Sequence, residues 1–166
     1  METPASISKH PIHPMLIVFP IGLWVFSFVC DLISFADPAN PDWYVVAFYA
    51  IGGGLIGALI AAIAGFIDWL SLKDPKMKSI GLIHMGLNIA IVVLFAINLG
   101  VRSTTMVPPP TLAIVLSAIG VGLLIVSGWL GAELVHVHKV SVADEPRATE
   151  RQTSSPSQVS RRERTA

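Results

Sequence analysis

The sequence predicts an all-α integral membrane protein: a four-helix bundle with cytoplasmic N- and C-termini and a disordered C-terminal tail. Two observations carry this prediction. Hydrophobic residues make up 53% of the 166 residues and charged residues only 13%, which is too apolar for an ordinary soluble domain of this length. The apolar residues also fall into four runs, each about as long as a bilayer crossing requires. The formal net charge is zero and the basic residues are dispersed, so we expect no nucleic-acid partner.

The first span is expected at about residues 14–35, after a polar N-terminal segment (1–9) that contains Lys9. Pro14 falls in the first helical turn, where its missing N–H costs little. Pro20 lies inside the span and should kink it. The apolar run is longer than the core of a signal peptide, so we expect the chain to retain it.

The second span is expected at about residues 43–70, after the turn DPANPD (37–42). Small residues recur along it at every fourth position and form a ridge against which another helix can pack closely. This ridge consists of Gly53, Gly57, Ala61 and Gly65. Asp68 follows near the end of the span.

The third span is expected at about residues 76–100, because Asp74 is a good N-cap and Pro75 suits the first helical position. His84 and Asn88 are four residues apart and therefore share a helical face.

The fourth span is expected at about residues 111–138 and completes a four-helix domain at 10–142. Residues 143–166 are rich in Ser, Thr, Arg and Glu with almost no large apolar residues, so we expect a disordered tail.

The distribution of basic residues predicts the orientation. An even number of spans puts both termini and the second connection on one side, which holds Lys9, Lys73, Lys76, Lys78, Lys139 and five tail arginines. The other side holds Arg102 alone. The positive-inside rule therefore predicts cytoplasmic termini and a multi-pass protein of the inner (cytoplasmic) membrane.

The same topology predicts a polar cluster. At a rise of 1.5 Å per residue, the distance along the helix from the nearest flanking lysine is roughly 7 to 9 Å for each of three residues: Asp68, His84 and Glu133. His13 lies at the cytoplasmic mouth of the first helix. All four helices therefore offer a polar or ionisable side chain at one level, where such groups are functional by default.

The fourth helix offers two further histidines. In a regular α-helix, Trp129, Glu133 and His136 share a face and His138 points elsewhere. Glu133-x-x-His136 has the ligand spacing of carboxylate-bridged di-metal bundles, although it occurs only once. Candidate metal ligands are His13, Asp68, His84, Glu133, His136 and His138; candidate cofactor-binding residues are His13, His84, His136 and His138.

Several stretches resemble a known family. They are HPIHPMLIVFPIGL (10–23), the Asp68 turn, the His84 helix and SGWLGAELV (127–135). Over roughly residues 8–142 the chain is similar to bacterial four-span membrane proteins catalogued as domain of unknown function 2231. The resemblance implies a four-helix membrane protein with no assigned activity, and some relatives look joined to iron–sulfur redox domains.

The family's last motif typically reads GWLGGELVYRHG, so the resemblance matches its glutamate to Glu133 and its histidine to His138. This chain departs from it, with Ala132 for glycine, His136 for tyrosine, Val137 for arginine and Lys139 for glycine. The resemblance favours His138 as a ligand, whereas helical geometry favours His136. Both are kept.

Three functions fit these features. The first is a membrane subunit that binds a redox cofactor, haem b, or a transition metal, and that serves a redox partner. The second is a proton- or cation-conducting transporter subunit, which would have to be a homo-oligomer. The third is a structural or assembly protein in which the cluster pins helices together. No phosphate-binding loop or activated nucleophile is found, so we expect no independent catalytic activity. The sequence does not decide the identity of the cofactor between haem b and a transition metal.

Overall fold

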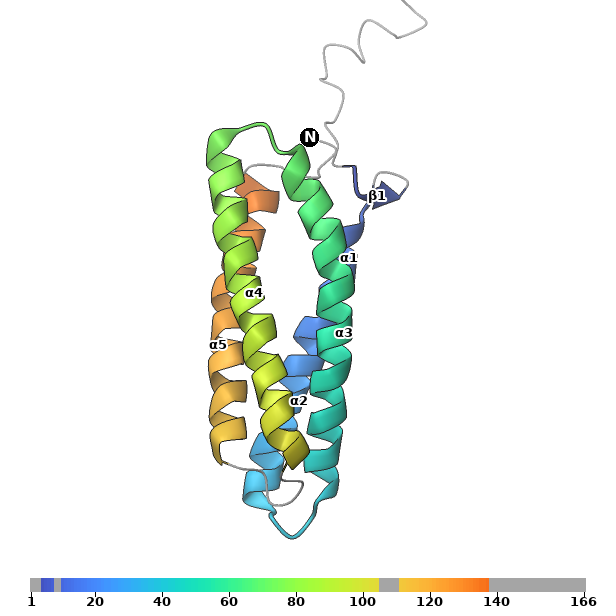
Figure 1. Cartoon of the computed structure of the whole chain (residues 1–166), viewed down its shortest axis with the longest axis vertical. Coiled ribbons are helices and arrows are strands. Elements are labelled where there is room, and N and C mark those ends of the chain that lie inside the picture. The colour runs from blue at the N-terminus through green and yellow to red at the C-terminus, as the bar shows by residue number, and fades with distance from the viewer. Residues whose placement is uncertain (1–3, 8–9, 105–110, 138–166) are drawn as a thin grey trace, which may run out of the picture.

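The chain forms an antiparallel helical bundle (Figure 1). The computed structural model describes residues 4–7, 10–104 and 111–137. Within these residues, four helical segments are long and apolar enough to cross a membrane: Ile12–Ala36, Asp42–Ser71, Pro75–Thr104 and Thr111–Val135. The predicted all-α architecture with four candidate spans is confirmed.

The four long helices are α2 (Val18–Ala36), α3 (Asp42–Ser71), α4 (Pro75–Thr104) and α5 (Thr111–Ala132). Helix α2 packs against α3 and α5, and α4 packs against the same two helices. Helices α2 and α4 therefore face each other across the bundle. We call the end that holds the N-terminus and the α3–α4 turn the N-terminal end, and the opposite end the far end (Figure 1).

The first span is divided into α1 (Ile12–Leu16) and α2, with Ile17 between them. Pro20 has no N–H to donate to the carbonyl of Leu16, so one helical hydrogen bond is missing there. Ile17 keeps helical dihedral angles (φ −66°, ψ −18°), so the proline interrupts the helix without ending it. Two short strands, β1 (Ser6–Ile7) and β2 (His10–Pro11), pair in front of α1.

Helix α4 begins where the sequence predicts. The Asp74 carboxylate accepts hydrogen bonds from the backbone N–H groups of Lys76 (2.8 Å) and Met77 (3.1 Å), so it caps the helix. The helix continues to Thr104, past the expected end at Gly100. The additional turn contains Arg102, whose side chain is buried inside the bundle.

The middle of the bundle is an apolar core. Its buried members are Trp24, Ile51, Ile91, Phe95 and Leu124, which come from all four long helices. The rings of Trp24 and Phe95 stack with their centres 4.4 Å apart. Along the first span and along α4 this layer lies between the two polar clusters described below, so it separates the two ends of the bundle.

The small-residue ridge of α3 packs closely against another helix, as predicted, and the structure shows that this helix is the first span. A Cβ atom added at Gly53 would lie 3.3 Å from the Leu23 side chain, and one at Gly57 would lie 3.3 Å from Pro20. The close approach of the two helices therefore depends on these glycines.

The fourth span departs from the expected regular helix. Helix α5 ends at Ala132, and Glu133–Val137 form a π-helix, η1. Hydrogen bonds in a π-helix run from i to i+5, so the α-helical spacing that placed Trp129, Glu133 and His136 on one face does not hold. Trp129 is 77% exposed and points away from the bundle interior.

Candidate functional site

A pair of histidines lies inside the N-terminal end of the bundle. His13 comes from α1 and His84 from α4, and their ring centres are 6.5 Å apart with the ring planes at 90°. Both residues are half-buried. Because α1 continues into α2, which lies diagonally opposite α4, the pair bridges the interior of the bundle. We call these two residues the histidine pair.

The His13 ring is held by the ridge of α3. Its Nδ1 atom lies 2.9 Å from the carbonyl oxygen of Ala61. A carbonyl oxygen can only accept, so Nδ1 carries the hydrogen and donates it. A Cβ added at Gly65 would lie 2.8 Å from the same Nδ1 atom. The ridge therefore also seats the His13 imidazole.

The His84 ring is held in the same way by α5. Its Nδ1 atom lies 3.0 Å from the carbonyl oxygen of Ser127 and therefore donates to it. The hydroxyl oxygen of Ser127 is 3.2 Å from Nδ1. On the other side of the ring, the Asn88 amide nitrogen is 3.1 Å from Nε2. The neutral imidazole thus keeps its lone pair on Nε2, where it accepts from Asn88.

Asp68, another predicted site residue, contacts the N-terminal segment. Its carboxylate accepts a hydrogen bond of 3.1 Å from the backbone N–H of Ala5, and only 8% of the residue is exposed. This contact fastens the segment that precedes His13 and α1 to α3. The structure gives Asp68 this partner, and a role as a metal ligand stays a prediction.

The remaining predicted residues belong to the end of the fourth span. Glu133 is half-buried in η1. The side chain of His136 and all of His138 lie outside the described residues. Within the described ranges, no three His, Cys, Asp or Glu side chains come together in a group that could hold a metal ion.

A second polar cluster, at the far end, was missed by the sequence reasoning. The Arg102 Nη2 and Asp31 Oδ2 atoms are 2.6 Å apart, and both side chains are fully buried. Arg102 Nε donates to Asn98 Oδ1 at 2.9 Å, and Nη2 also lies 3.2 Å from the Ser117 hydroxyl. We call Asp31, Asn98, Arg102 and Ser117 the far-end network.

One signal in the sequence could have found this network. Asp31 interrupts the first span, and Arg102 follows the third span by two residues, so the topology puts opposite charges at one end of the bundle. Asn98 precedes Arg102 by four residues and therefore lies on its helical face. The sequence reasoning assigned Arg102 to a connecting loop, and a loop residue is not expected to pair inside the bundle.

The model of one protein family, described as "Predicted membrane protein (DUF2231)", matches residues 9–144. The chain belongs to this family. The match confirms the resemblance that the motifs indicated, and it covers all the helices, the histidine pair and the far-end network. Nothing matches among the curated proteins, and nothing matches among the solved structures. The DUF2231 description names a membrane protein without an activity.

Proposed function

We propose that this DUF2231 protein is a membrane subunit that binds a redox cofactor or metal through the histidine pair, with haem b as the favoured cofactor. The observation that carries the proposal is that both Nδ1 atoms donate to backbone carbonyl groups, of Ala61 and Ser127. Each neutral ring then has its lone pair on Nε2, the atom that would bind a metal. Metal-binding histidines almost always donate their other ring N–H in this way, which fixes the tautomer and the ring orientation.

The number of ligands favours haem over a metal held only by protein. A haem iron needs one or two axial side chains, whereas an isolated zinc or di-metal centre needs at least three or four protein ligands. The described residues supply two imidazoles close together and no group of three metal-binding side chains. One metal bonded to a nitrogen of each ring at about 2 Å would put the ring centres roughly 6 Å apart, near the 6.5 Å observed.

One hydrogen bond has to open before His84 can bind a metal. The Asn88 amide donates to His84 Nε2 and also to the His84 carbonyl oxygen, at 2.8 Å. Rotation of the Asn88 side chain would release Nε2 while the Nδ1 contact to Ser127 stays in place. A haem held here would supply one-electron chemistry. The chain itself would bind the iron, orient both imidazoles and, through Asp68 and Glu133, handle protons near the site.

A second function has support from the same contacts. His13 joins α1 to α3, and His84 joins α4 to α5. Two interhelical hydrogen bonds at one level would pin the bundle without any cofactor, and such bonds contribute about 0.6 kcal/mol each in membrane proteins. Under this alternative the protein has a structural or assembly role.

The arrangement does not favour conduction of protons or cations through a single chain. The apolar core lies between the histidine pair and the far-end network, and its five residues are almost completely buried. A conducting path would need polar groups or water through this layer. An oligomer could still provide a path between subunits.

We propose that the histidine pair faces the cytoplasm and that the protein lies in the inner membrane. The support is the excess of lysines at the N-terminal end, where Lys73, Lys76 and Lys78 surround the α3–α4 turn. The far end holds the buried Arg102, whose charge Asp31 neutralises. This asymmetry follows the positive-inside rule.

The test of the cofactor proposal is an absorption spectrum of the full-length protein purified in detergent, with iron quantified in the same sample. We expect a Soret band that is lost in His84→Ala and in His13→Ala. His10→Ala is the matched control because it removes a nearby histidine outside the pair. A colourless, iron-free protein that also binds no added haemin would reject haem and leave the structural alternative.

A further inference from the structure

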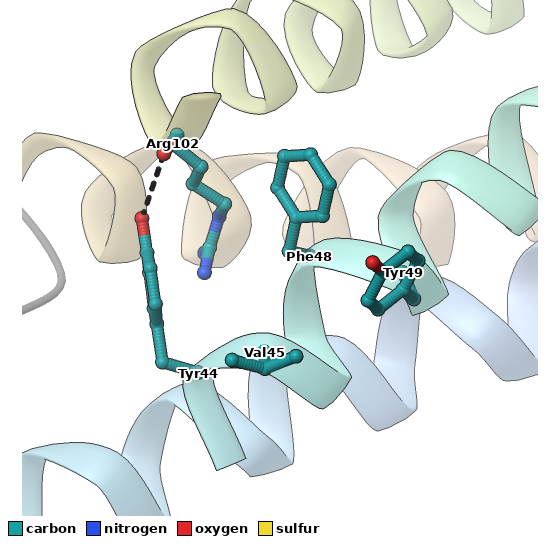
Figure 2. Close-up of a pocket in the computed structure, with 5 residues that line it drawn as sticks. All are labelled: Tyr44, Val45, Phe48, Tyr49 and Arg102. Carbon is teal, nitrogen blue, oxygen red and sulfur yellow. Dashed lines mark hydrogen bonds between the residues drawn. The ribbon is translucent and has the colours of Figure 1, made fainter. Parts of the chain in front are cut away.

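A cavity opens beside Arg102 at the far end of the bundle, between α3 and α4. Its volume is about 70 Å³, and its lining consists of Tyr44, Val45, Phe48, Tyr49 and Arg102 (Figure 2). A single water needs about 10–15 Å³ of such space. The cavity can therefore accept several waters or the polar head of a larger molecule.

Arg102, one of the residues that line this cavity, has an unused hydrogen-bond donor. Its Nε and Nη2 atoms bond to the far-end network, but its fully buried Nη1 has no hydrogen-bond partner among the described residues. Figure 2 shows the side chain descending from α4 into the space between the rings of Tyr44 and Phe48. Leaving a buried donor unsatisfied costs about 1–3 kcal/mol, and more for a charged group, so a ligand with an acceptor atom would relieve this cost.

The charge of the network indicates what kind of acceptor fits. Arg102 carries one positive charge and Asp31, 2.6 Å away, carries one negative charge, while Asn98 and Ser117 are neutral. An anion at Nη1 would be attracted by Arg102 and repelled by Asp31 at nearly the same range. A neutral oxygen avoids this repulsion and still accepts a charge-assisted hydrogen bond.

The cavity lining indicates the rest of the ligand. Three of the lining side chains are aromatic and one is aliphatic. Val45 and Tyr49 are 40% and 71% exposed on the outer surface of α3, so the cavity is reached from the lipid-facing side of the bundle. A ligand that arrives from the bilayer with an apolar or flat body suits such a site.

We propose that this cavity binds the neutral carbonyl oxygen of an apolar molecule from the bilayer, with Arg102 Nη1 as the donor and the aromatic side chains around the body of the ligand. A membrane quinone and the ester group of a phospholipid share this chemistry. The proposal does not depend on the histidine pair, which lies on the other side of the apolar core.

The test uses a matched pair of variants on α3. Val45 lines the cavity, whereas its neighbour Val46 is similarly exposed (38%) and lies outside the lining. Val45→Trp should fill the cavity without changing a charge, and Val46→Trp adds the same side chain elsewhere. The full-length protein is delipidated in detergent and titrated with decylubiquinone, with a diester phosphatidylcholine, and with the diether phosphatidylcholine that lacks carbonyl groups.

We expect one of the two carbonyl probes to bind saturably, with an affinity at least tenfold weaker in Val45→Trp and unchanged in Val46→Trp. Preference for decylubiquinone would identify a quinone, and preference for the diester over the diether lipid would identify a phospholipid. The paired substitution of Asp31→Asn with Arg102→Gln, which keeps the network neutral but removes the guanidinium donor, should weaken binding by a similar factor. The proposal is overturned if no probe binds saturably, if both tryptophan variants bind alike, or if the diether lipid binds as tightly as the tighter of the two carbonyl probes.

Discussion

His13 and His84 lie with their ring centres 6.5 Å apart, although they belong to helices that face each other across the bundle and are 71 positions apart in the chain. Each ring is fixed from behind by a backbone carbonyl, that of Ala61 for His13 and that of Ser127 for His84. Both Nδ1 atoms are thereby engaged by backbone carbonyl groups, and His84 Nε2 accepts a hydrogen bond from Asn88 on its own helix.

The seating of His13 can be tested through the ridge of α3. A methyl group in Gly65→Ala would lie 2.8 Å from His13 Nδ1, closer than real Cβ contacts come, so the imidazole must move and lose its bond to Ala61. We expect at least tenfold weaker binding of added haemin. Gly52→Ala is the matched control, because no heavy atom lies within 4 Å of the position of its Cβ. Equal haemin affinity in both variants would show that His13 does not hold the cofactor.

The hydrogen bond from Asn88 separates the cofactor proposal from the structural alternative. Asn88→Ala removes the amide that occupies His84 Nε2. If His84 binds iron, the variant should bind haemin as tightly as the wild type or more tightly, because no hydrogen bond has to open. If the histidine pair serves only to pin the helices, the variant should bind no haemin, and its unfolding free energy should fall by about 0.5–1.5 kcal/mol because the His84 ring loses one hydrogen bond within α4. Haemin titration and denaturant unfolding in detergent measure the two quantities.

The far-end network should dominate the stability of its end of the bundle. Arg102→Met leaves Asp31 as an uncompensated buried charge, and such a loss costs about 3–5 kcal/mol. The pair Asp31→Leu with Arg102→Met removes both charges, so its stability should lie closer to the wild type than that of either single variant. Unfolding of all four proteins in detergent completes this double-mutant cycle. A double variant as unstable as the sum of the singles would show that the two residues act independently.

The proposed orientation can be measured by cysteine labelling in intact cells. The native Cys30 is buried and should give little background. Lys76→Cys places a thiol at the exposed α3–α4 turn and Ser103→Cys places one at the exposed far end. With a membrane-impermeant maleimide we expect labelling of Ser103→Cys but not of Lys76→Cys before lysis. The reverse pattern would place the histidine pair on the outer side.

The sequence was sufficient to predict the helices, and it brought His13 and His84 to one level, because hydropathy and charge patterns directly encode length and topology. It could not predict which polar atoms would bond. The partners of both rings are backbone carbonyl oxygens, of Ala61 and Ser127, and every residue has one. Only the rotation of the helices about their axes decides which carbonyl meets an imidazole.

The other differences have local causes. The π-helix of Glu133–Val137 shifts side chains relative to the α-helical spacing, so face assignments beyond Ala132 could not be derived from sequence positions alone. Arg102 stands only two residues after the expected end of a span. Its burial depends on Asp31 and Asn98, which a reading of separate helices does not bring together.

The most direct test of the central claim is the ligation state of iron in the purified protein. After saturation with haemin, near-infrared magnetic circular dichroism and electron paramagnetic resonance distinguish low-spin iron with two imidazole ligands from iron with one. We expect a low-spin, bis-histidine signature in the wild type and in Gly52→Ala, and the loss of this signature in both His13→Ala and His84→Ala. A wild-type protein that binds no haemin, or a signature that survives in either histidine variant, would contradict the assignment of these two residues as the ligand pair.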